Sequence, residues 1–416
     1  MSLRTILVFA CFTLGGIAFA GDSVRVGPFA VDASPPVGSP LAYDPLAAVE
    51  SPLSCRGVVL VGAGKPIVLC AIDWIGLSND GHRLFRQALA EAAGTGIERV
   101  SVHALHQHDA PRCDFSAESL LIKQGLTGAG FNPEHARKVI ADSAAAVGRA
   151  VMQAQPVTHL GIGSARVEKV ASNRRILGED GKILHTRFTA TADPAIRAFP
   201  AGTIDPILRM ISFWNGDQAI AALTYYATHP QSYYRTGLAN PDFPGMARNA
   251  REEASGIPHV HFNGAGGDIG AGKWNDGAKE NRQVLADRVA AGMKGAWKNT
   301  VKSPLTAEDV SWTVEPVRLP VSKHMDEESL RATMEDKEIA GPMRYMAAKH
   351  IAWLERCRRG DQTELSCLAL REARILHLPG ELFVAYQLAA QKMRPDLQVA
   401  MAAYGDYAPG YIGTEA

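Results

Sequence analysis

Apolar, strand-like runs alternate with amphipathic helical patterns along most of this chain. Such alternation is typical of α/β architecture, in which helices cover the faces of a sheet. Two of the runs are joined by Asn215-Gly216, a strong signal for a tight hairpin between antiparallel strands. We therefore predict an α/β fold with mixed β-sheets layered with helices. The expected strands are 56–62, 66–73, 100–106, 207–214, 219–229, 259–264, 372–380 and 398–406, and the expected helices are 81–93, 133–153, 243–254, 279–298, 326–337, 343–358 and 381–393.

The length allows one large domain or two or three modest ones, and we predict a single large domain. The chain has 416 residues, of which 46% are hydrophobic, so it can bury a sizeable core. It contains neither an internal repeat nor a low-complexity tract. The stretches 109–132 and 178–205 are expected to be loops, and neither has the composition of a domain linker.

The charge balance argues against a nucleic-acid partner. Lys plus Arg and Asp plus Glu both count 43, so the formal net charge is zero. Proteins that bind nucleic acids carry a basic excess or a basic stripe, and the sequence has neither. The short charge runs are interpreted as solvated helix faces.

The N-terminus has the layout of a secretory signal. Arg4 precedes a mostly apolar stretch, 6–17, and small residues surround a cleavage point after Ala20. The apolar stretch is too short to span a bilayer, and we find no other candidate transmembrane segment. We predict that residues 1–20 are a signal peptide and that 21–416 is exported to the periplasm or secreted, with contact to a membrane surface left open.

The cysteines and the C-terminus raise two further expectations. Cleavage leaves an odd number of cysteines, so at least one thiol is left over even in an oxidising compartment. Cys357 and Cys367 flank a polar stretch and either close a loop or stay separate. The chain stops directly after a strand and a Tyr-rich turn, and we expect a natural continuation beyond Ala416. The cysteines of the mature chain are Cys55, Cys70, Cys113, Cys357 and Cys367.

A histidine-rich stretch, "SVHALHQHDAP", ends one of the predicted strands. In an extended segment, residues i and i+2 point to the same face, so His106 and His108 can face one cleft. Imidazole nitrogen is a favoured zinc ligand, and a catalytic zinc keeps one position open. The alternative is that both histidines form hydrogen bonds in a loop. His103 lies on the other face and is interpreted as structural.

Three further motifs contain candidate site residues. His229 and Pro230 end a β-rich run, at the strand end where α/β sheets place their ligands, although a buried histidine bonded to the backbone fits equally well. The "LPGE" turn places Glu381 at the expected start of a helix, where a carboxylate is also favoured by the helix dipole alone. A Gly-rich turn follows "HVHFNG", whose own His-x-His pair, His259 and His261, competes with the first pair.

The order of these motifs resembles the catalytic domain of the neutral, non-lysosomal ceramidase family across nearly the whole mature chain. The family's His-x-His pair with its small-residue and proline loop resembles "HQHDAP", and its "LPGE" turn is matched at 378–381. Its strand-terminal His-Pro step resembles 229–230, its Asn-Arg step resembles 173–174, and its Tyr-rich turn before "T-E" resembles 407–415. Each motif is short, and the specificity lies in their order.

This resemblance implies a zinc-dependent amide hydrolase acting on a small-molecule or lipid amide. The zinc ligands that it implies are His106, His229, Glu381 and Tyr411, with Tyr407 as the alternative tyrosine. The catalytic residues that it implies are His108 and Arg174, which would polarise the scissile carbonyl, and Tyr407. The substrate-binding residues that we assign to the Gly-rich turn are Asp268 and Gly270.

One departure from the family pattern bears on the substrate. The ceramidases have a serine in a "G-D-V-S" turn, where this chain has Gly270 after "GDI". Without that hydroxyl, we expect direct attack by water, because zinc can lower the pKa of water from about 15.7 to about 7. The alternatives are a zinc hydrolase of another ester or amide on the same scaffold and a non-catalytic surface-binding homologue.

Overall fold

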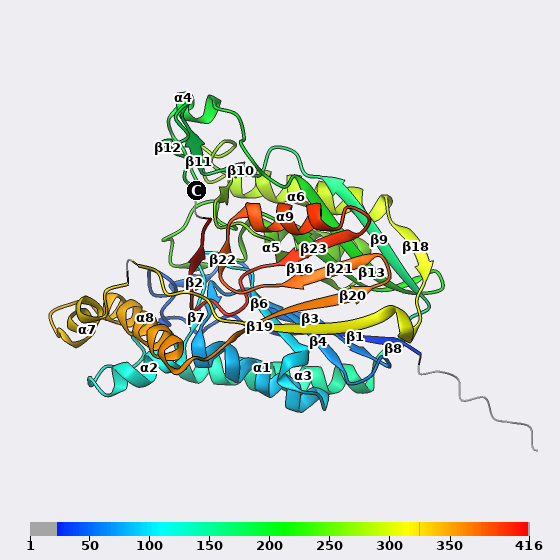
Figure 1. Ribbon diagram of the computed structural model, residues 1–416, viewed down its shortest axis with the longest axis horizontal. Coiled ribbons are helices and arrows are strands. Elements are labelled where there is room, and N and C mark those ends of the chain that lie inside the picture. The colour runs from blue at the N-terminus through cyan, green and yellow to red at the C-terminus, as the bar shows by residue number, and fades with distance from the viewer. Residues whose placement is uncertain (1–22, 324, 415–416) are drawn as a thin grey trace, which may run out of the picture.

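The computed structural model describes residues 23–323 and 325–414, so the predicted signal peptide lies outside the described residues. Within these residues, two five-stranded sheets pack face to face, and helices cover the outer face of each (Figure 1). Antiparallel pairs predominate, but β4 with β6, β14 with β16 and β21 with β23 are parallel. The predicted α/β fold with mixed sheets is confirmed.

The first sheet separates a helical layer from the central core. Alternate side chains of a strand point to opposite faces. Val59 accordingly packs toward α1 and α3, while Val58 and Leu60 join the core between the sheets. The strand order is β6 (Val100–Ala104), β4 (Ile67–Ile72), β3 (Ser54–Val61), β1 (Arg25–Asp32) and β8 (Gln155–Pro156), and the covering helices are α1 (Asn79–Ala93) and α3 (Pro133–Met152).

The second sheet contains the predicted hairpin. Its strands β13 (Ile207–Asn215) and β14 (Gln218–Tyr226) pair antiparallel around the Asn215-Gly216 turn, in which Gly216 has a φ of 58°. Ile211, Phe213 and Leu223 face the central core, whereas Met210 and Ala222 pack against α5 (Asp242–Ser255) and α6 (Asn281–Lys298). The other strands are β16 (His259–Asn263), β9 (His159–Arg166) and β18 (Val301–Pro304).

A four-stranded sheet extends the central core at one edge. It contains β19 (Val310–Val317), β20 (Thr363–Leu370), β21 (Ala373–His377) and β23 (Gln398–Ala402) in that order. Leu368, Ile375 and Ala400 join the core between the two larger sheets. The turns that follow β21 and β23 carry the "LPGE" and Tyr-rich motifs, so this sheet positions half of the candidate site.

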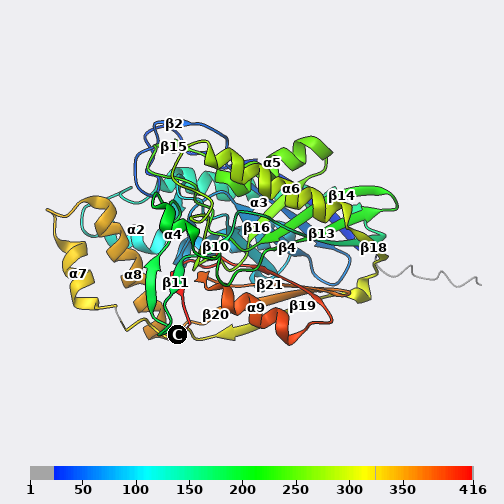
Figure 2. The same cartoon turned by 90° about the horizontal axis from the view of Figure 1, so that it is seen from above.

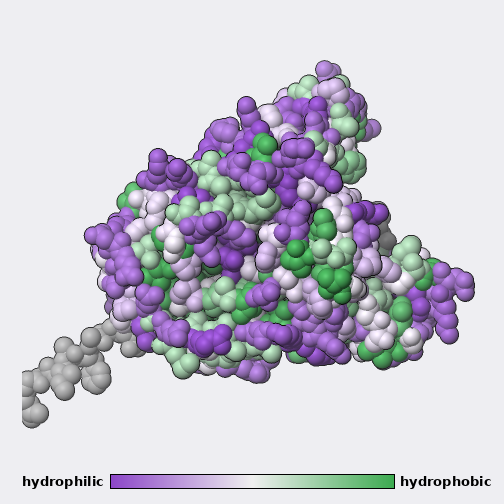
Figure 3. Space-filling model, turned by 180° about the vertical axis from the view of Figure 1, so that it is seen from behind, coloured by the Kyte–Doolittle hydropathy of each residue, from purple (hydrophilic) through white to green (hydrophobic). Residues whose placement is uncertain are grey.

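Three helices and several short elements surround the end of the molecule where the site lies. Figure 2 shows α7 (Glu327–Glu335) and α8 (Gly341–Arg359) together at that end, with α2 (Phe115–Ile122) beside α8. Apolar side chains on the rear face gather toward the same end (Figure 3), and Ile122 and Met343 are among the exposed apolar residues of these helices. The remaining short elements are β2 (Ala48–Val49), β5 (Gly76–Leu77), β7 (Arg112–Cys113), β10 (Ser172–Asn173), β11 (Arg175–Leu177), β12 (Ile183–Thr186), α4 (Pro194–Ala198), β15 (Leu238–Ala239), β17 (Ile269–Gly270), β22 (Glu381–Leu382), α9 (Val384–Met393) and β24 (Tyr411–Ile412).

The structure corrects several sequence-based expectations. Glu381 does not begin a helix, because it belongs to β22, which pairs with β24, and α9 begins at Val384. The expected loop 109–132 contains β7 and α2, and the expected loop 178–205 contains β12 and α4. Within the described residues the cysteines are free, so Cys357 and Cys367 do not close a loop, while the Sγ atoms of Cys55 and Cys70 lie 3.4 Å apart.

Over 23–323 and 325–414, none of the helices combines the length and the apolar character that crossing a bilayer requires.

Candidate metal centre and its cleft

His106 lies two residues beyond β6, where its backbone turns left-handed with a φ of 70°. Its amide donates to the Trp74 carbonyl, and its Nδ1 atom lies 2.5 Å from the carbonyl oxygen of Ile75. Because a carbonyl only accepts hydrogen bonds, Nδ1 carries the ring proton and Nε2 has a lone pair. This Nε2 atom is buried and finds no hydrogen-bond partner among the described residues.

His108 and His229 complete a buried group of three imidazoles. The strand expected to carry His106 and His108 ends at Ala104, so alternation of faces does not explain their proximity. The loop nevertheless brings their rings to a centroid distance of 5.2 Å. His229, three residues beyond β14, has its Nε2 atom 2.8 Å from Nε2 of His108. One ring nitrogen from each of the three histidines lies within 4.8 Å of the others.

Glu381 places a buried carboxylate beside two of these imidazoles. Its Oε1 atom lies 3.4 Å from Nε2 of His106, and its Oε2 atom lies 3.7 Å from Nδ1 of His229. The backbone of β22 is held by a bond from the Glu381 amide to the Gly410 carbonyl. Gly380, directly before it, has a φ of 59°, a left-handed conformation that glycine adopts at little cost.

Three tyrosines of the closing turn approach the same group. The Tyr404 ring stacks on His106 at a centroid distance of 4.4 Å, and the Tyr407 hydroxyl donates a short hydrogen bond to Oε1 of Glu381. Tyr411 is 54% exposed, and its hydroxyl lies 3.1 Å from a guanidinium nitrogen of Arg174. Tyr407 donates to the carboxylate, and Tyr411 is also close enough to interact with it, so the choice between Tyr407 and Tyr411 as a metal ligand stays a prediction.

The electrostatics of the group favour neutral imidazoles. Burial lowers the pKa of His108 and of His229 well below the usual value, and the neighbouring imidazoles lower both further. Burial also lowers the pKa of His106, although the Glu381 carboxylate opposes this shift. Neutral imidazole is the form that binds a metal. His106 Nε2, His229 Nδ1 and Glu381 Oε2 are buried without hydrogen-bond partners in the described part of the chain, so the donor set fits a divalent cation such as zinc.

Asp268, another predicted site residue, lies next to the segment that carries Arg174. Asp268 is 3% exposed, and its carboxylate accepts hydrogen bonds from Asn173, Arg175 and the Val384 amide. These bonds give Asp268 a structural role, and its predicted contact with a substrate stays a prediction. They hold the segment that carries Arg174, which contacts Tyr411.

Gly270 has room for a side chain. A Cβ atom built on it would lie 3.6 Å from Cγ of Arg174, an ordinary van der Waals contact. Packing therefore does not require a glycine at this position, so the absence of a hydroxyl here is a difference in chemistry rather than a steric necessity.

A cavity of about 790 Å³ opens beside His106, His108 and Glu381. Its lining is mostly apolar and comes from the segment 40–45, from Ile75 and from α7 and α8. Ligand pockets are commonly apolar clefts of this size with a few polar groups that orient the ligand. The cavity residues of α8 include Met343, Met346 and Lys349. The sequence patterns did not point to Lys349 or to Arg112 from β7.

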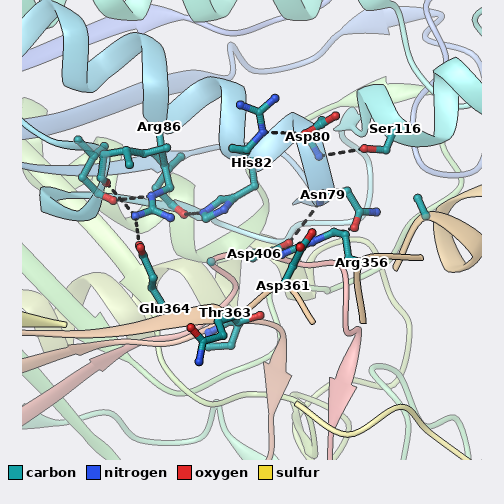
Figure 4. Close-up of a pocket in the computed structure, with 18 of the residues that line it drawn as sticks. Asn79, Asp80, His82, Arg86, Ser116, Arg356, Asp361, Thr363, Glu364 and Asp406 are labelled. Atoms are coloured by element: carbon teal, nitrogen blue, oxygen red, sulfur yellow. Dashed lines mark hydrogen bonds and ion pairs between the residues drawn. The ribbon is translucent and has the colours of Figure 1, made fainter. Parts of the chain in front are cut away.

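A second cavity of about 550 Å³ is lined in part by the Leu378-Pro379 turn. Charged side chains that line it form ion pairs with one another: Arg86 pairs with Glu364, and Arg356 pairs with Asp406 (Figure 4). Asp406 also accepts hydrogen bonds from the Asn79 and Ala408 amides, and so ties the Tyr-rich turn to the start of α1. The bonds of Asp406 at this cavity therefore hold the turn that carries Tyr404 and Tyr407.

Comparisons with known proteins identify the fold. No family model matches this chain, and no curated protein matches it. Among solved structures, the neutral ceramidase from Pseudomonas aeruginosa aligns with a TM-score of 0.65 and 16% identity, over 94% of this chain and 69% of that chain. A ceramidase complexed with C2 aligns with the same TM-score and identity, over 94% of this chain and 70% of that one. The resemblance to the neutral ceramidases is thus confirmed at the level of the fold.

Proposed function

We propose that this chain, folded like a neutral ceramidase, is a zinc-dependent hydrolase that cleaves an amide bond in a substrate with a long apolar chain. The observation that carries the proposal is the buried set of three imidazoles and the Glu381 carboxylate at one wall of an apolar cavity. The solved structures that share the fold are named as ceramidases, so amide hydrolysis is the first activity to test.

The residues around the cavity have separate tasks in this proposal. When bound, zinc acts as a Lewis acid and makes water a nucleophile near neutral pH. Arg174 and His108 would donate hydrogen bonds to the oxygen that gains negative charge during the reaction, an effect worth about 3 kcal/mol per well-placed donor. His108 or the Tyr407 hydroxyl would deliver a proton to the leaving nitrogen. Tyr407 would also orient the Glu381 carboxylate, to which its hydroxyl donates.

The substrate need not be ceramide. Gly270 leaves this chain without the hydroxyl that the ceramidases carry in the corresponding turn, although the turn has space for one. A different amide cleaved on the same scaffold is therefore the second candidate. We further propose that the protein acts outside the cytoplasm, on the basis of the signal-like segment 1–20. Mass spectrometry of the protein from a secreting host would detect cleavage after Ala20.

Release of dodecanoate from N-dodecanoyl amines tests the activity. Zinc-loaded protein is expected to cleave them, and chelator-treated protein is expected to regain activity when zinc is added back. His106→Ala should lose more than the roughly 10–100-fold that removal of an outer-sphere partner costs. His185→Ala, a half-buried histidine of β12 away from the site, is the matched control and should keep full activity. Undiminished turnover by His106→Ala would refute the proposal.

A further inference from the structure

Two cations line the cavity without a carboxylate partner. Lys349 and Arg112 both face it, and over the described residues neither lies within 4.0 Å of an Asp or Glu oxygen. Buried charges are normally paired, because removing an ion from water is costly unless an opposite charge compensates. The carboxylates of Asp114, Glu381 and Asp406 act on Lys349 only from beyond this distance. Both side chains can therefore take an anion from a ligand in the cavity.

Lys349 lies close to the reacting centre. Its side chain is 4% exposed, and its Nζ atom lies 4.2 Å from the centroid of the Tyr407 ring, whose hydroxyl donates to Glu381. The cation–π contact stabilises the ammonium only in part. In the part of the chain that the structure describes, this ammonium makes no hydrogen bond, so its donors are free for a ligand in the cavity.

Arg112 has partners that leave its charge uncompensated. One terminal nitrogen donates to the thioether sulfur of Met346 at 2.9 Å, and the other donates to the carbonyl of Ala42. Its Nε atom is buried without a hydrogen-bond partner in the described residues. Neither a thioether nor a carbonyl carries a negative charge, and guanidinium is well suited to bind a carboxylate.

In the described residues, the cavity's own carboxylates form no ion pair with Lys349 or Arg112 within 4.0 Å, although Glu381 acts on Lys349 from farther away. They belong to Asp44 and Glu381. Glu381 contacts two imidazoles and accepts the Tyr407 hydroxyl. Asp44 forms no ion pair within 4.0 Å anywhere in the described residues, and its Oδ2 atom is buried without a hydrogen-bond partner there. Arg235, at the exposed rim, adds a third cation to the same lining.

The rest of the lining is suited to an alkyl chain. Leu330 of α7 and Pro342, Met343 and Met346 of α8 form an apolar wall that continues from Lys349. Met346 is three residues before Lys349, one helical turn away on the same face of α8. A ligand that fills the cavity would thus place an anionic group near Tyr407 and an apolar chain along these methionines.

We infer that the substrate is an anionic amphiphile, an N-acyl amino acid, whose carboxylate binds Lys349 and Arg112 while its acyl chain lies along Met343 and Met346. The inference rests on the proposed hydrolase activity and names the substrate class for it. Ceramide carries no charge and would leave both cations without a counter-ion. Hydrolysis would add water across the amide bond, so that the hydroxyl goes to the acyl carbon and the proton to the amine, with a fatty acid and an amino acid as products.

Two substrates with the same acyl chain test this inference. N-Dodecanoylglycine carries the carboxylate, and N-dodecanoylethanolamine replaces it with a neutral hydroxyl. The protein is expected to favour the glycine conjugate in kcat/KM by at least about tenfold, the range for a hydrogen bond to a charged group. Lys349→Met, which keeps the length of the side chain, should lose about tenfold on the glycine conjugate. On the ethanolamine conjugate its rate should change less than about threefold. Arg112→Gln should show the same selectivity.

Controls separate this inference from the proposed activity. Lys392→Met removes an exposed lysine at the end of α9 and should change neither rate. Equal rates on both substrates, or equal losses on both in Lys349→Met, would overturn the inference while leaving the hydrolase intact. If neither substrate is cleaved, calorimetric titration of metal-free protein decides: N-dodecanoylglycine should bind at least about tenfold more tightly than its neutral partner, and Lys349→Met should abolish the difference. Equal binding would overturn the inference.

Discussion

The Nδ1 atom of His106 donates a hydrogen bond to the carbonyl oxygen of Ile75 over a distance of 2.5 Å. The bond fixes the tautomer, so that the opposite nitrogen, Nε2, presents a lone pair to Glu381 at 3.4 Å. Partners of this kind orient histidine ligands and increase their affinity for a metal. The backbone between β4 and β5, rather than a side chain, thus prepares His106 for its role.

A buried ion pair anchors this backbone. Asp73, two residues before Ile75, binds Arg248 through both carboxylate oxygens at 2.6 and 2.9 Å, and neither side chain is exposed. Arg248→Met should lower the free energy of unfolding by about 3–5 kcal/mol, because it leaves a buried carboxylate unpaired. The exposed pair Arg358–Glu327 is the control, and Arg358→Met should cost less than about 1 kcal/mol. Guanidinium unfolding of both variants checks this, and similar losses would contradict it.

The turn before Glu381 should tolerate no side chain at its glycine. Gly380 and Gly410 both have a left-handed backbone, with φ of 59° and 66°. A Cβ atom on Gly380 would lie 2.6 Å from the Gly410 carbonyl oxygen, whereas one on Gly410 would meet open space. Gly410→Ala should therefore cost only the backbone strain, about 1–2 kcal/mol. Gly380→Ala should cost more and also weaken zinc binding. Thermal unfolding and zinc titration would show the difference, and equal effects would be inconsistent with this geometry.

Gly270 should accept a serine. Its nearest neighbour would be 3.6 Å from the new Cβ atom, whereas a Cβ atom on Gly272 would lie 1.9 Å from the Phe188 carbonyl oxygen. Gly270→Ser should change the free energy of unfolding by no more than about 0.5 kcal/mol. Gly272→Ser should cost about 1–3 kcal/mol or more through overpacking. Urea unfolding midpoints measure both, and a Gly270→Ser variant as unstable as Gly272→Ser would show that the turn is tighter than described.

Buried histidines should make the protein sensitive to acid. Burial lowers the pKa of His261 to about 3, whereas an imidazole in an unfolded chain titrates near 6.5. Below about pH 6.5 the unfolded chain therefore binds a proton that the folded chain does not, so stability is complete above this pH and falls as the pH drops. The slope is about 1.4 kcal/mol per pH unit for this residue, down to its folded pKa.

His261→Gln tests this linkage. The variant is expected to be less stable than the wild type at pH 7, because His261 contacts Thr224 in the core. Between pH 7 and pH 5 the difference should shrink by about 2 kcal/mol, since only the wild type loses the contribution of the neutral imidazole. Unfolding curves at several pH values provide the measurement, and parallel pH profiles would rule the linkage out.

Much of the fold could be predicted because its strands have continuous or alternating apolar patterns. All six residues of β4 are buried, and the hairpin of β13 and β14 has an unambiguous turn. The strand β9 was missed because "HLGIGSAR" contains two glycines and few large apolar residues. Gly161 and Gly163 are nonetheless needed there, since a Cβ atom on Gly163 would lie 2.2 Å from the Ala296 carbonyl oxygen of α6. The strand is stabilised by its close packing against a helix, and a local sequence pattern cannot indicate such a tertiary contact.

The residues of the candidate metal centre could be predicted where they belong to short sequence motifs. His106, His108, His229 and Glu381 come together as the order of motifs suggested, although Glu381 does so from a strand rather than from a helix. Lys349 could not be predicted, because a lysine among the charged residues of an amphipathic helix is normally solvated. Its burial depends on the packing of α8 against α2 and on the fold around Tyr407, which only the tertiary structure shows.

Zinc analysis of the purified protein tests the central claim most directly. After dialysis against metal-free buffer, the wild type is expected to retain one zinc ion per chain. Variants with alanine at His106, His229 or Glu381 should contain less than about a tenth of that and remain folded by circular dichroism. A wild-type protein without stoichiometric zinc, or folded variants with undiminished zinc, would contradict the assignment of these side chains as a metal centre.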